Sequence, residues 1–171
     1  TQDVAKSLAE LGAPEGLVVI AEEMYGGRGR FKRKWYAPRG GLWISIMLKP
    51  KHIKALQLLS IATGVAVVKA IKNLFDIPLK LKWPNDVIYR DKKLAGILIE
   101  AGMEIDVIHY IIVGIGINVN NDLPVELKAT AISLKEIIGF EIPRVPILRS
   151  ILKEFDEVYG LLTQGKIHNI I

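Results

Sequence analysis

A ten-residue segment that combines glycines with basic side chains is the part of the sequence best suited to bind an anion. Residues 26–35 read GGRGRFKRKW and hold three glycines, five basic residues and a tryptophan. Glycines let backbone N–H groups approach a ligand closely, and arginines form planar forks that match carboxylate and phosphate oxygens. Trp35 adds a flat face for a base or a cation. The segment predicts a loop for a ligand with carboxylate and phosphate groups, although a solvated basic loop has a similar composition.

Two further segments place polar groups beside glycines. One reads KWPND over residues 82–86 and continues into KLAG over residues 93–96; the other reads GIGINVN over residues 114–120. Taken alone, Pro-Asn-Asp is a turn signal and a single lysine is more often solvated than catalytic. Gly-x-Gly-x-Asn would need a helix after it to be a dinucleotide fingerprint, and the residues that follow do not indicate one. No P-loop motif is present in the sequence.

The elements that must position these segments follow from the hydrophobic pattern. Residues 22–39 form a long charged loop, and loops of that length are usually functional or mobile. In the helix expected over residues 1–11, Val4, Leu8 and Leu11 share one face. Short hairpin connections favour an α+β fold with a mixed, largely antiparallel sheet packed on helices. We expect strands over residues 17–21, 41–48, 79–83, 87–89, 93–100 and 107–119, and helices over residues 1–11, 53–75, 133–139 and 146–162.

Composition limits the possible classes of protein. The 171 residues suit one domain, and 50% of them are hydrophobic, which excludes a disordered chain. The absence of cysteine from the sequence excludes disulfides and thiolate chemistry, and three scattered histidines do not favour a histidine metal site. No apolar run reaches the ~20 residues of a membrane span, and no signal-peptide pattern opens the sequence, so we expect a cytoplasmic protein. The net charge of +5 suits anionic ligands, either nucleotides or nucleic acid.

Five motifs taken together, in order and spacing, resemble the catalytic domain of biotin protein ligases. They read GRGRxxRxW, PxGGLWxS, KWPND, KLAGILxE and GIGINVN, and the resemblance runs from Thr1 to about Leu162. It implies a fold of the class II aminoacyl-tRNA synthetase and biotin ligase type, with residues 1–171 as one catalytic domain. Thr1-Gln2 resembles the end of the family's Ser-Thr-Asn segment. We therefore expect the chain to lack an N-terminal strand and the C-terminal SH3-like domain usual in the family.

The resemblance also implies a reaction. The family makes biotinyl-5′-AMP from biotin and ATP with Mg²⁺, and then transfers biotin to a lysine of a biotin carboxyl carrier protein. The first step joins a carboxylate to an α-phosphate, so cationic clamps and backbone N–H groups must offset the repulsion of two anions. A homodimer is the family expectation. Some family members bind DNA through a winged-helix domain; none precedes Thr1, so we expect no DNA binding and no membrane partner.

Site residues carry over motif by motif. Catalytic roles are implied for Lys93, Arg28, Arg30 and Asp86. ATP or adenylate contacts are implied for Arg30, Arg33, Trp35, Lys82 and Asn118, with Trp35 on adenine and Mg²⁺ near Asp86. The expected apolar wall for biotin is Trp43, Leu98 and Ile117. Biotin contacts are implied for Thr1, Gln2, Met24, Gly27, Arg28, Gly29, Arg30, Lys93, Gly96, Gly114 and Gly116.

One residue departs from the family pattern. Many relatives carry glutamine where this chain has Met24, and a thioether cannot donate a hydrogen bond to the ureido group of biotin.

Two alternative functions stay open. A lipoate or octanoate ligase would share the fold and the adenylate chemistry. A nucleic-acid-binding module would use the basic loop, and its binding to random duplex DNA would fall steeply with salt.

Overall fold

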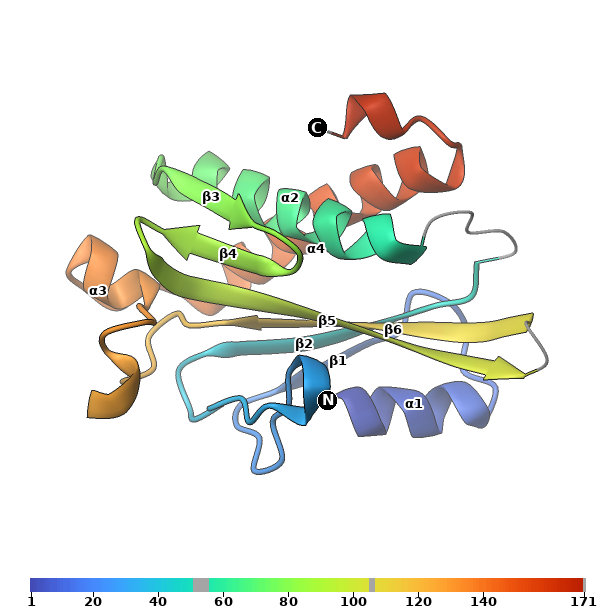
Figure 1. Cartoon of the computed structure of the whole chain (residues 1–171), viewed down its shortest axis with the longest axis horizontal. Coiled ribbons are helices and arrows are strands. Elements are labelled where there is room, and N and C mark those ends of the chain that lie inside the picture. The colour runs from blue at the N-terminus through green and yellow to red at the C-terminus, as the bar shows by residue number, and fades with distance from the viewer. Residues whose placement is uncertain (51–55, 105–106, 171) are drawn as a thin grey trace.

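A six-stranded sheet lies between two layers of helix in the computed structural model, which describes residues 1–50, 56–104 and 107–170 (Figure 1). The strand order is β1-β2-β6-β5-β4-β3, and all five pairings are antiparallel; a parallel bridge joins Lys93 to Ala131, which lies outside the six strands. The α+β prediction is therefore confirmed. The strands are β1 Val18–Ala21, β2 Leu42–Leu48, β3 Leu79–Lys82, β4 Asp86–Tyr89, β5 Lys92–Glu104 and β6 Val107–Ile117.

One face of the sheet carries the main apolar core under α2 (Leu56–Phe75) and α4 (Arg144–Thr163) (Figure 1). In β6, alternate residues point into this core, among them Ile115 and Ile117. The predicted start of α2 at residue 53 lies outside the described residues. The apolar window Leu58–Phe75 is long and apolar enough to cross a membrane by length and composition alone, contrary to the expectation that no segment would be. Half of that window is buried inside the domain, as expected for a core helix.

The other face carries α1 (Gln2–Glu10). Ala5 and Ala9 are buried against the sheet, whereas Val4 and Leu11 are 54% and 83% exposed. The apolar face that includes Val4 and Leu11 is therefore not the one that packs on the sheet. Small alanines one turn apart let the helix lie close to the sheet, and Leu11 comes after its last turn.

Element ends differ from prediction in ways that have local causes. The helix predicted from Pro146 begins at Arg144, because a proline in the first turn needs no N–H partner. The short helix α3 (Leu134–Ile138) has the predicted Ser133 cap, which forms a capping box with Glu136, and ends at Gly139 with φ 97°. Short 3₁₀ turns, η1 Arg30–Lys32, η2 Val125–Leu127 and η3 Ile167–Asn169, complete the described elements.

Candidate active site

One register row crosses the sheet and carries five residues that were predicted for the site. Gly116 pairs with Trp43 on one side and with Gly96 on the other. Gly96 in turn pairs with Asp86, and Asp86 with Lys82. Directly opposed residues of antiparallel strands project to the same face of a sheet. The row therefore aligns these residues, from β2 across to β3, on the face of the sheet that α1 covers.

A second row lies two residues along the strands and therefore on the same face. It contains Ser45, Gly114 and Leu98. We call the surface formed by Gly96, Gly114 and Gly116 the glycine floor, because no side chain rises from the sheet there. The predicted apolar wall is only partly correct: Trp43 and Leu98 project to this face, whereas strand alternation puts Ile117 in the helix-side core.

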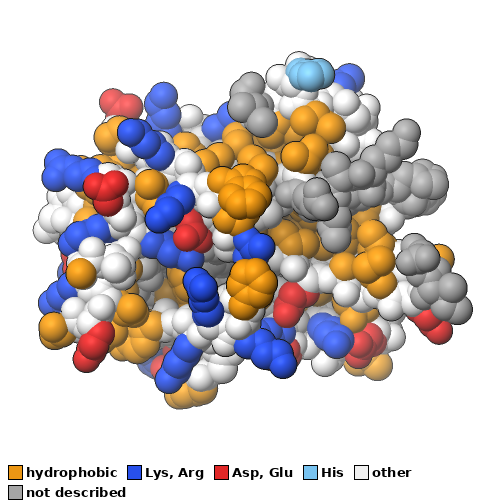
Figure 2. All heavy atoms as spheres, viewed as in Figure 1, with side chains coloured by type: hydrophobic (Ala, Val, Ile, Leu, Met, Phe, Trp, Pro, Cys, Tyr) orange, Lys and Arg blue, Asp and Glu red, His pale blue; other side chains and the backbone are white. Residues whose placement is uncertain are grey.

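The basic loop folds into a small hairpin above the floor. Met24 bridges to Ala37, and Gly29 N–H donates to the Arg33 carbonyl at 2.8 Å. Trp35 N–H donates to the Gly27 carbonyl at 2.9 Å, and a Cβ on Gly27 would lie 2.5 Å from the Trp35 carbonyl oxygen. Gly27 is therefore needed for this close approach. Figure 2 shows Lys and Arg side chains gathered over the loop and the β3–β4 hairpin.

Trp35 covers the floor itself. Its indole lies where a Cβ on Gly116 would come within 2.9 Å of Nε1, and where a Cβ on Gly96 would come within 3.1 Å of Cζ3. The ring meets Trp43 edge-on at 6.3 Å between centroids. Trp35 Nε1 is buried and has no hydrogen-bond partner among the described residues. An unpaired buried N–H is costly, so this position of the indole is poorly stabilised on its polar edge.

Lys93 and Asp86 form an ion pair at the margin of the floor. Lys93 Nζ lies 2.7 Å from Asp86 Oδ1 and 5.0 Å from the centroid of the Trp35 ring. Their side chains are 32% and 25% exposed, so the pair is reachable from solvent without being fully solvated. The structure thus brings the predicted site residues Lys93, Asp86, Gly96 and Trp35 together.

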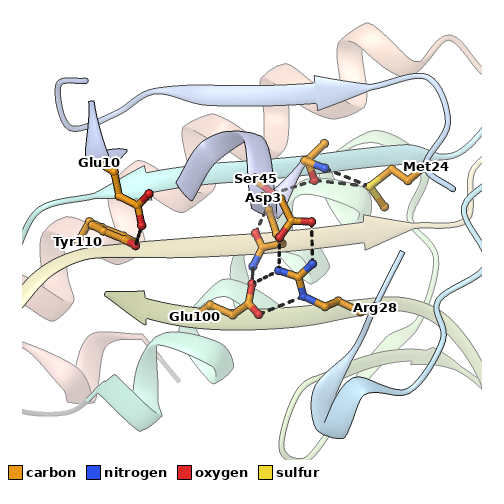
Figure 3. A network of polar contacts seen from close by, with 9 residues as sticks. Asp3, Glu10, Met24, Arg28, Ser45, Glu100 and Tyr110 are labelled. Carbon is orange, nitrogen blue, oxygen red and sulfur yellow. Dashed lines mark hydrogen bonds and ion pairs between the residues drawn. The ribbon is translucent and has the colours of Figure 1, made fainter. Parts of the chain in front are cut away.

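Arg28 occupies a polar network at the other margin (Figure 3). It donates to Asp3 at 2.7 and 2.9 Å and to Glu100 at 3.0 and 3.2 Å. The hydrogen bonds to Asp3, and then those to Glu100, raise the pKa of Arg28, and the bond from Arg28 is the main cause that lowers the pKa of Asp3. Gln2 Nε2 donates to Glu100 at 2.9 Å.

The N-terminal residues close this end of the floor. Ser45 Oγ lies 2.7 Å from Gln2 Oε1 and 2.8 Å from Thr1 Oγ1. Thr1 Oγ1 lies 3.6 Å from Met24 Sδ, so the thioether is directed at Thr1. A Cβ on Gly114 would lie 2.9 Å from the Gln2 amide, which shows that Gln2 covers this glycine. The residues predicted for the ureido end of biotin are thus adjacent.

Comparison with known proteins identifies the family of this chain. The profile of the biotin/lipoate A/B protein ligase family matches residues 1–118. The chain belongs to this family. A solved relative, the biotin protein ligase from Aquifex aeolicus in complex with biotin and ATP, is 37% identical with a TM-score of 0.84, covering 95% of this chain and 72% of the relative.

Two curated family members are also similar. The bifunctional ligase/repressor BirA of Bacillus subtilis is 41% identical, over 96% of this chain and 53% of its own length. The biotin–[acetyl-CoA-carboxylase] ligase of Mycobacterium tuberculosis is 35% identical, over 83% of this chain and 53% of its own length. This chain therefore spans about half the length of the curated family members that it matches.

Other predicted contacts lie further from the floor. Arg30 Nη1 reaches Asn85 Oδ1 at 3.5 Å, a long contact on the exposed side of the loop. Arg33 and Lys82 are exposed. Asn118 is 3% exposed and accepts from Asn121 Nδ2 at 3.1 Å, so its side chain is engaged inside the domain. Adenylate contacts by these residues stay predictions.

Three members of the polar network were missed as site residues: Asp3, Ser45 and Glu100. Ser45 and Glu100 end two of the quoted motifs, and strand alternation from Gly96 would have placed Glu100 on the floor side. Nothing in the sequence indicated Asp3. A separate cavity of about 120 Å³ lies between α2 and the Trp83–Asp86 turn. It is lined by Gly64 and Ile97 of the helix side and also by the predicted site residues Lys82 and Asp86, so it adjoins the site but is not the space above the floor.

Proposed function

We propose that this chain activates biotin with ATP to give biotinyl-5′-AMP and transfers the biotin to a lysine of a carrier protein. The observation that supports the proposal most strongly is the Lys93–Asp86 pair at the margin of the glycine floor, beneath a loop rich in arginine. Bare backbone over Gly96, Gly114 and Gly116 leaves room for a bicyclic ring once the covering side chains move. The complex of the Aquifex relative with biotin and ATP supports the same ligands, and the name of the Mycobacterium tuberculosis relative supports the same reaction. The name of the Bacillus subtilis relative supports a ligase.

In the first step a carboxylate oxygen of biotin attacks the α-phosphorus of ATP, and the bond to pyrophosphate breaks. We assign Lys93 to the two reacting anions, where its ammonium stabilises charge on the transferring phosphoryl oxygens. Arg30 and Arg33 are assigned to the phosphates. In the second step the ε-amine of the carrier lysine attacks the acyl carbon and AMP leaves. Asp86, released from Lys93 by the anions, lies where it could accept the proton of that amine.

Trp35 has to move for this chemistry to occur. Its indole occupies the space over Gly96 and Gly116 that we assign to biotin, and its N–H has no partner there among the described residues. A ligand in this space displaces the ring, which is then available to stack on adenine. Displacement costs little on the polar edge of the ring, because no hydrogen bond is lost.

The site offers oxygen donors of the type that Mg²⁺ binds, but only a few of them. Asp86 and Asn85 offer oxygen ligands of the kind that Mg²⁺ prefers, and within the described residues no group of three or more His, Cys, Asp or Glu could hold a metal. We propose that Asp86 would hold a Mg²⁺ carried mainly by the phosphates of ATP. When bound, the ion neutralises phosphate charge.

The family name covers lipoate as well as biotin, so the acid must be tested directly. Pyrophosphate release is measured with biotin, lipoate and octanoate in parallel at equal concentration. We expect biotin to be used best, in line with the biotin protein ligase of Aquifex aeolicus at 37% identity and the biotin–[acetyl-CoA-carboxylase] ligase of Mycobacterium tuberculosis at 35%. Faster release with lipoate or octanoate would replace the biotin assignment with the other branch of the family.

We further propose an acetyl-CoA-carboxylase-type carrier as acceptor, a cytoplasmic location where ATP and carrier are available, and a homodimer. The edge strand β1 offers an unpaired edge for such a dimer, which sedimentation would detect. DNA binding is not part of the proposal: ion pairs of Arg28, Arg39 and Lys93 with acidic side chains reduce the positive charge of this face. Steeply salt-dependent binding to random duplex DNA would favour the nucleic-acid alternative.

A further inference from the structure

Three segments far apart in the sequence meet at one guanidinium group (Figure 3). Arg28 in the basic loop makes paired contacts with Asp3 of α1 and with Glu100 of β5. All three of its side-chain nitrogens are engaged. Such forked contacts fix the direction of a side chain as well as its charge. Arg28 therefore links the loop both to α1 and to the sheet.

Glu100 is the better anchored of the two carboxylates. It lies on a central strand and accepts a second hydrogen bond from Gln2 Nε2 at 2.9 Å. Gln2 is held in turn by Ser45 Oγ at 2.7 Å and covers Gly114. The Glu100 side chain is 40% exposed, against 77% for Asp3. Contact with Glu100 should thus be less screened by solvent than contact with Asp3.

The charges around Arg28 argue against direct binding of the substrate by its guanidinium group. One guanidinium faces two carboxylates, so a substrate carboxylate would have to displace a fixed acidic group to bind it. Lys93, by contrast, pairs with one carboxylate, at the other margin of the floor. Arg28 is therefore placed to hold the loop, and its acidic partners are placed to hold Arg28.

We propose that Glu100, assisted by Asp3, is a positioning residue that acts through Arg28 to keep the basic loop closed over the glycine floor. This assignment rests on the proposed biotin ligase function. A closed loop slows the escape of biotin and biotinyl-AMP but does not take part in bond making. Loss of Glu100 should thus affect ligand retention far more than the chemical step.

The test is Glu100→Gln in the full chain. Glutamine keeps the size of the side chain but replaces a charged, two-oxygen acceptor with one amide oxygen. We expect the KM for biotin and the release rate of biotinyl-AMP to rise about tenfold, the scale of one charge-assisted contact. Single-turnover adenylation at saturating biotin should stay within about threefold of wild type. Asp3→Asn should change the same quantities in the same direction by less.

Two further variants serve as controls. Glu104→Gln removes a 77% exposed carboxylate from the same strand, away from the loop, and should change none of these quantities. Arg28→Lys keeps the charge but not the fork, so it should reproduce Glu100→Gln. The double variant Arg28→Lys/Glu100→Gln should then be little worse than either single variant.

Hydrogen exchange over residues 26–35, measured without ligand, gives a readout that needs no activity. Glu100→Gln should speed exchange there and leave β6 unchanged. Unchanged exchange together with an unchanged KM would overturn the proposal, as would a lower single-turnover rate at constant KM. If the wild-type chain forms no biotinyl-AMP, the proposed biotin ligase function is wrong. The hydrogen-exchange comparison of wild type and Glu100→Gln would then still test whether Glu100 positions the loop. Should Glu100→Gln melt below Glu104→Gln, Asp3→Asn provides the same comparison from an exposed position.

Discussion

The two faces of the sheet come from the same strands, but on one face the strands contribute large side chains and on the other they contribute glycines. Toward α2 and α4, residues such as Ile111, Val113 and Ile115 fill a dry core with branched side chains. Toward α1 and the loop, their immediate neighbours Gly114 and Gly116 carry no side chain, and the space above them is filled by Gln2 and Trp35 from elsewhere. A side chain that is fixed to its strand cannot make way for a ligand, whereas one contributed by another element, here the loop or the start of α1, can. Alternate residues of one strand thus have different roles: one set packs in the core and stabilises the fold, and the other leaves room for a ligand.

The largest effect should come from Lys93, which acts only on the floor side. Lys93→Ala is expected to lower adenylate formation by roughly 10²–10³-fold, the scale of losing one electrostatic donor in an organised site. Biotin binding should weaken less than the chemical step, because the charge of Lys93 matters most in the transition state. Single-turnover adenylation and a thermal melt measure the two effects. An unchanged rate would remove Lys93 from the mechanism, and a collapsed melting temperature would make its role structural.

A substitution on the helix side should show the opposite pattern. Ile115→Ala leaves a cavity at a side chain that is 2% exposed and is expected to cost about 2–5 kcal/mol of unfolding free energy. Activity per folded molecule should change little, because the neighbouring glycines keep their positions. Urea unfolding with parallel adenylation assays checks this. Loss of activity without loss of stability would show that the two faces are not independent.

Gly116→Ala probes the floor directly. The added methyl would lie 2.9 Å from Trp35 Nε1 and would enter the space assigned to biotin. We expect the KM for biotin to rise about tenfold with little change in stability, because the overlying indole can shift. Gly160→Ala in α4, where a Cβ meets no atom within 4 Å, is the matched control. Equal KM values for the two variants would mean that the ligand binds elsewhere.

Much of this arrangement could be predicted from the sequence, because it depends on strand alternation. The GIGIN and KLAG motifs, with period-two patterning, suffice to predict glycines on one face and isoleucines on the other. The same rule, applied strictly, would have moved Ile117 to the core and Glu100 to the site. Contacts between the strands and the loop or α1 could not be predicted this way. No periodicity links Asp3 to Arg28, or Trp35 to Gly116, since tertiary packing alone brings them together.

The smallest expected effect is the pH dependence of the Asp3–Arg28 pair. The hydrogen bond from Arg28 lowers the pKa of Asp3 below its ordinary value of about 4. The pair therefore stabilises the folded state above that ordinary value, and this contribution is lost as pH falls through the folded pKa. With Asp3 77% exposed, it should amount to less than about 1 kcal/mol and weaken with salt. The unfolding free energies of wild type and Asp3→Asn should differ at pH 7 and converge as pH falls through the folded pKa of Asp3; a difference that does not change with pH would contradict this account.

The most direct test of the central claim is mass spectrometry of the protein after incubation with biotin, ATP and Mg²⁺. If the glycine floor beneath the basic loop binds and activates biotin, wild type should retain biotinyl-5′-AMP after rapid desalting, and Lys93→Ala should retain much less. Parallel incubations with lipoate and octanoate should leave no comparable adenylate. Retention of a lipoyl or octanoyl adenylate in place of biotinyl-AMP would contradict the ligand assignment, and equal retention by Lys93→Ala would contradict the site.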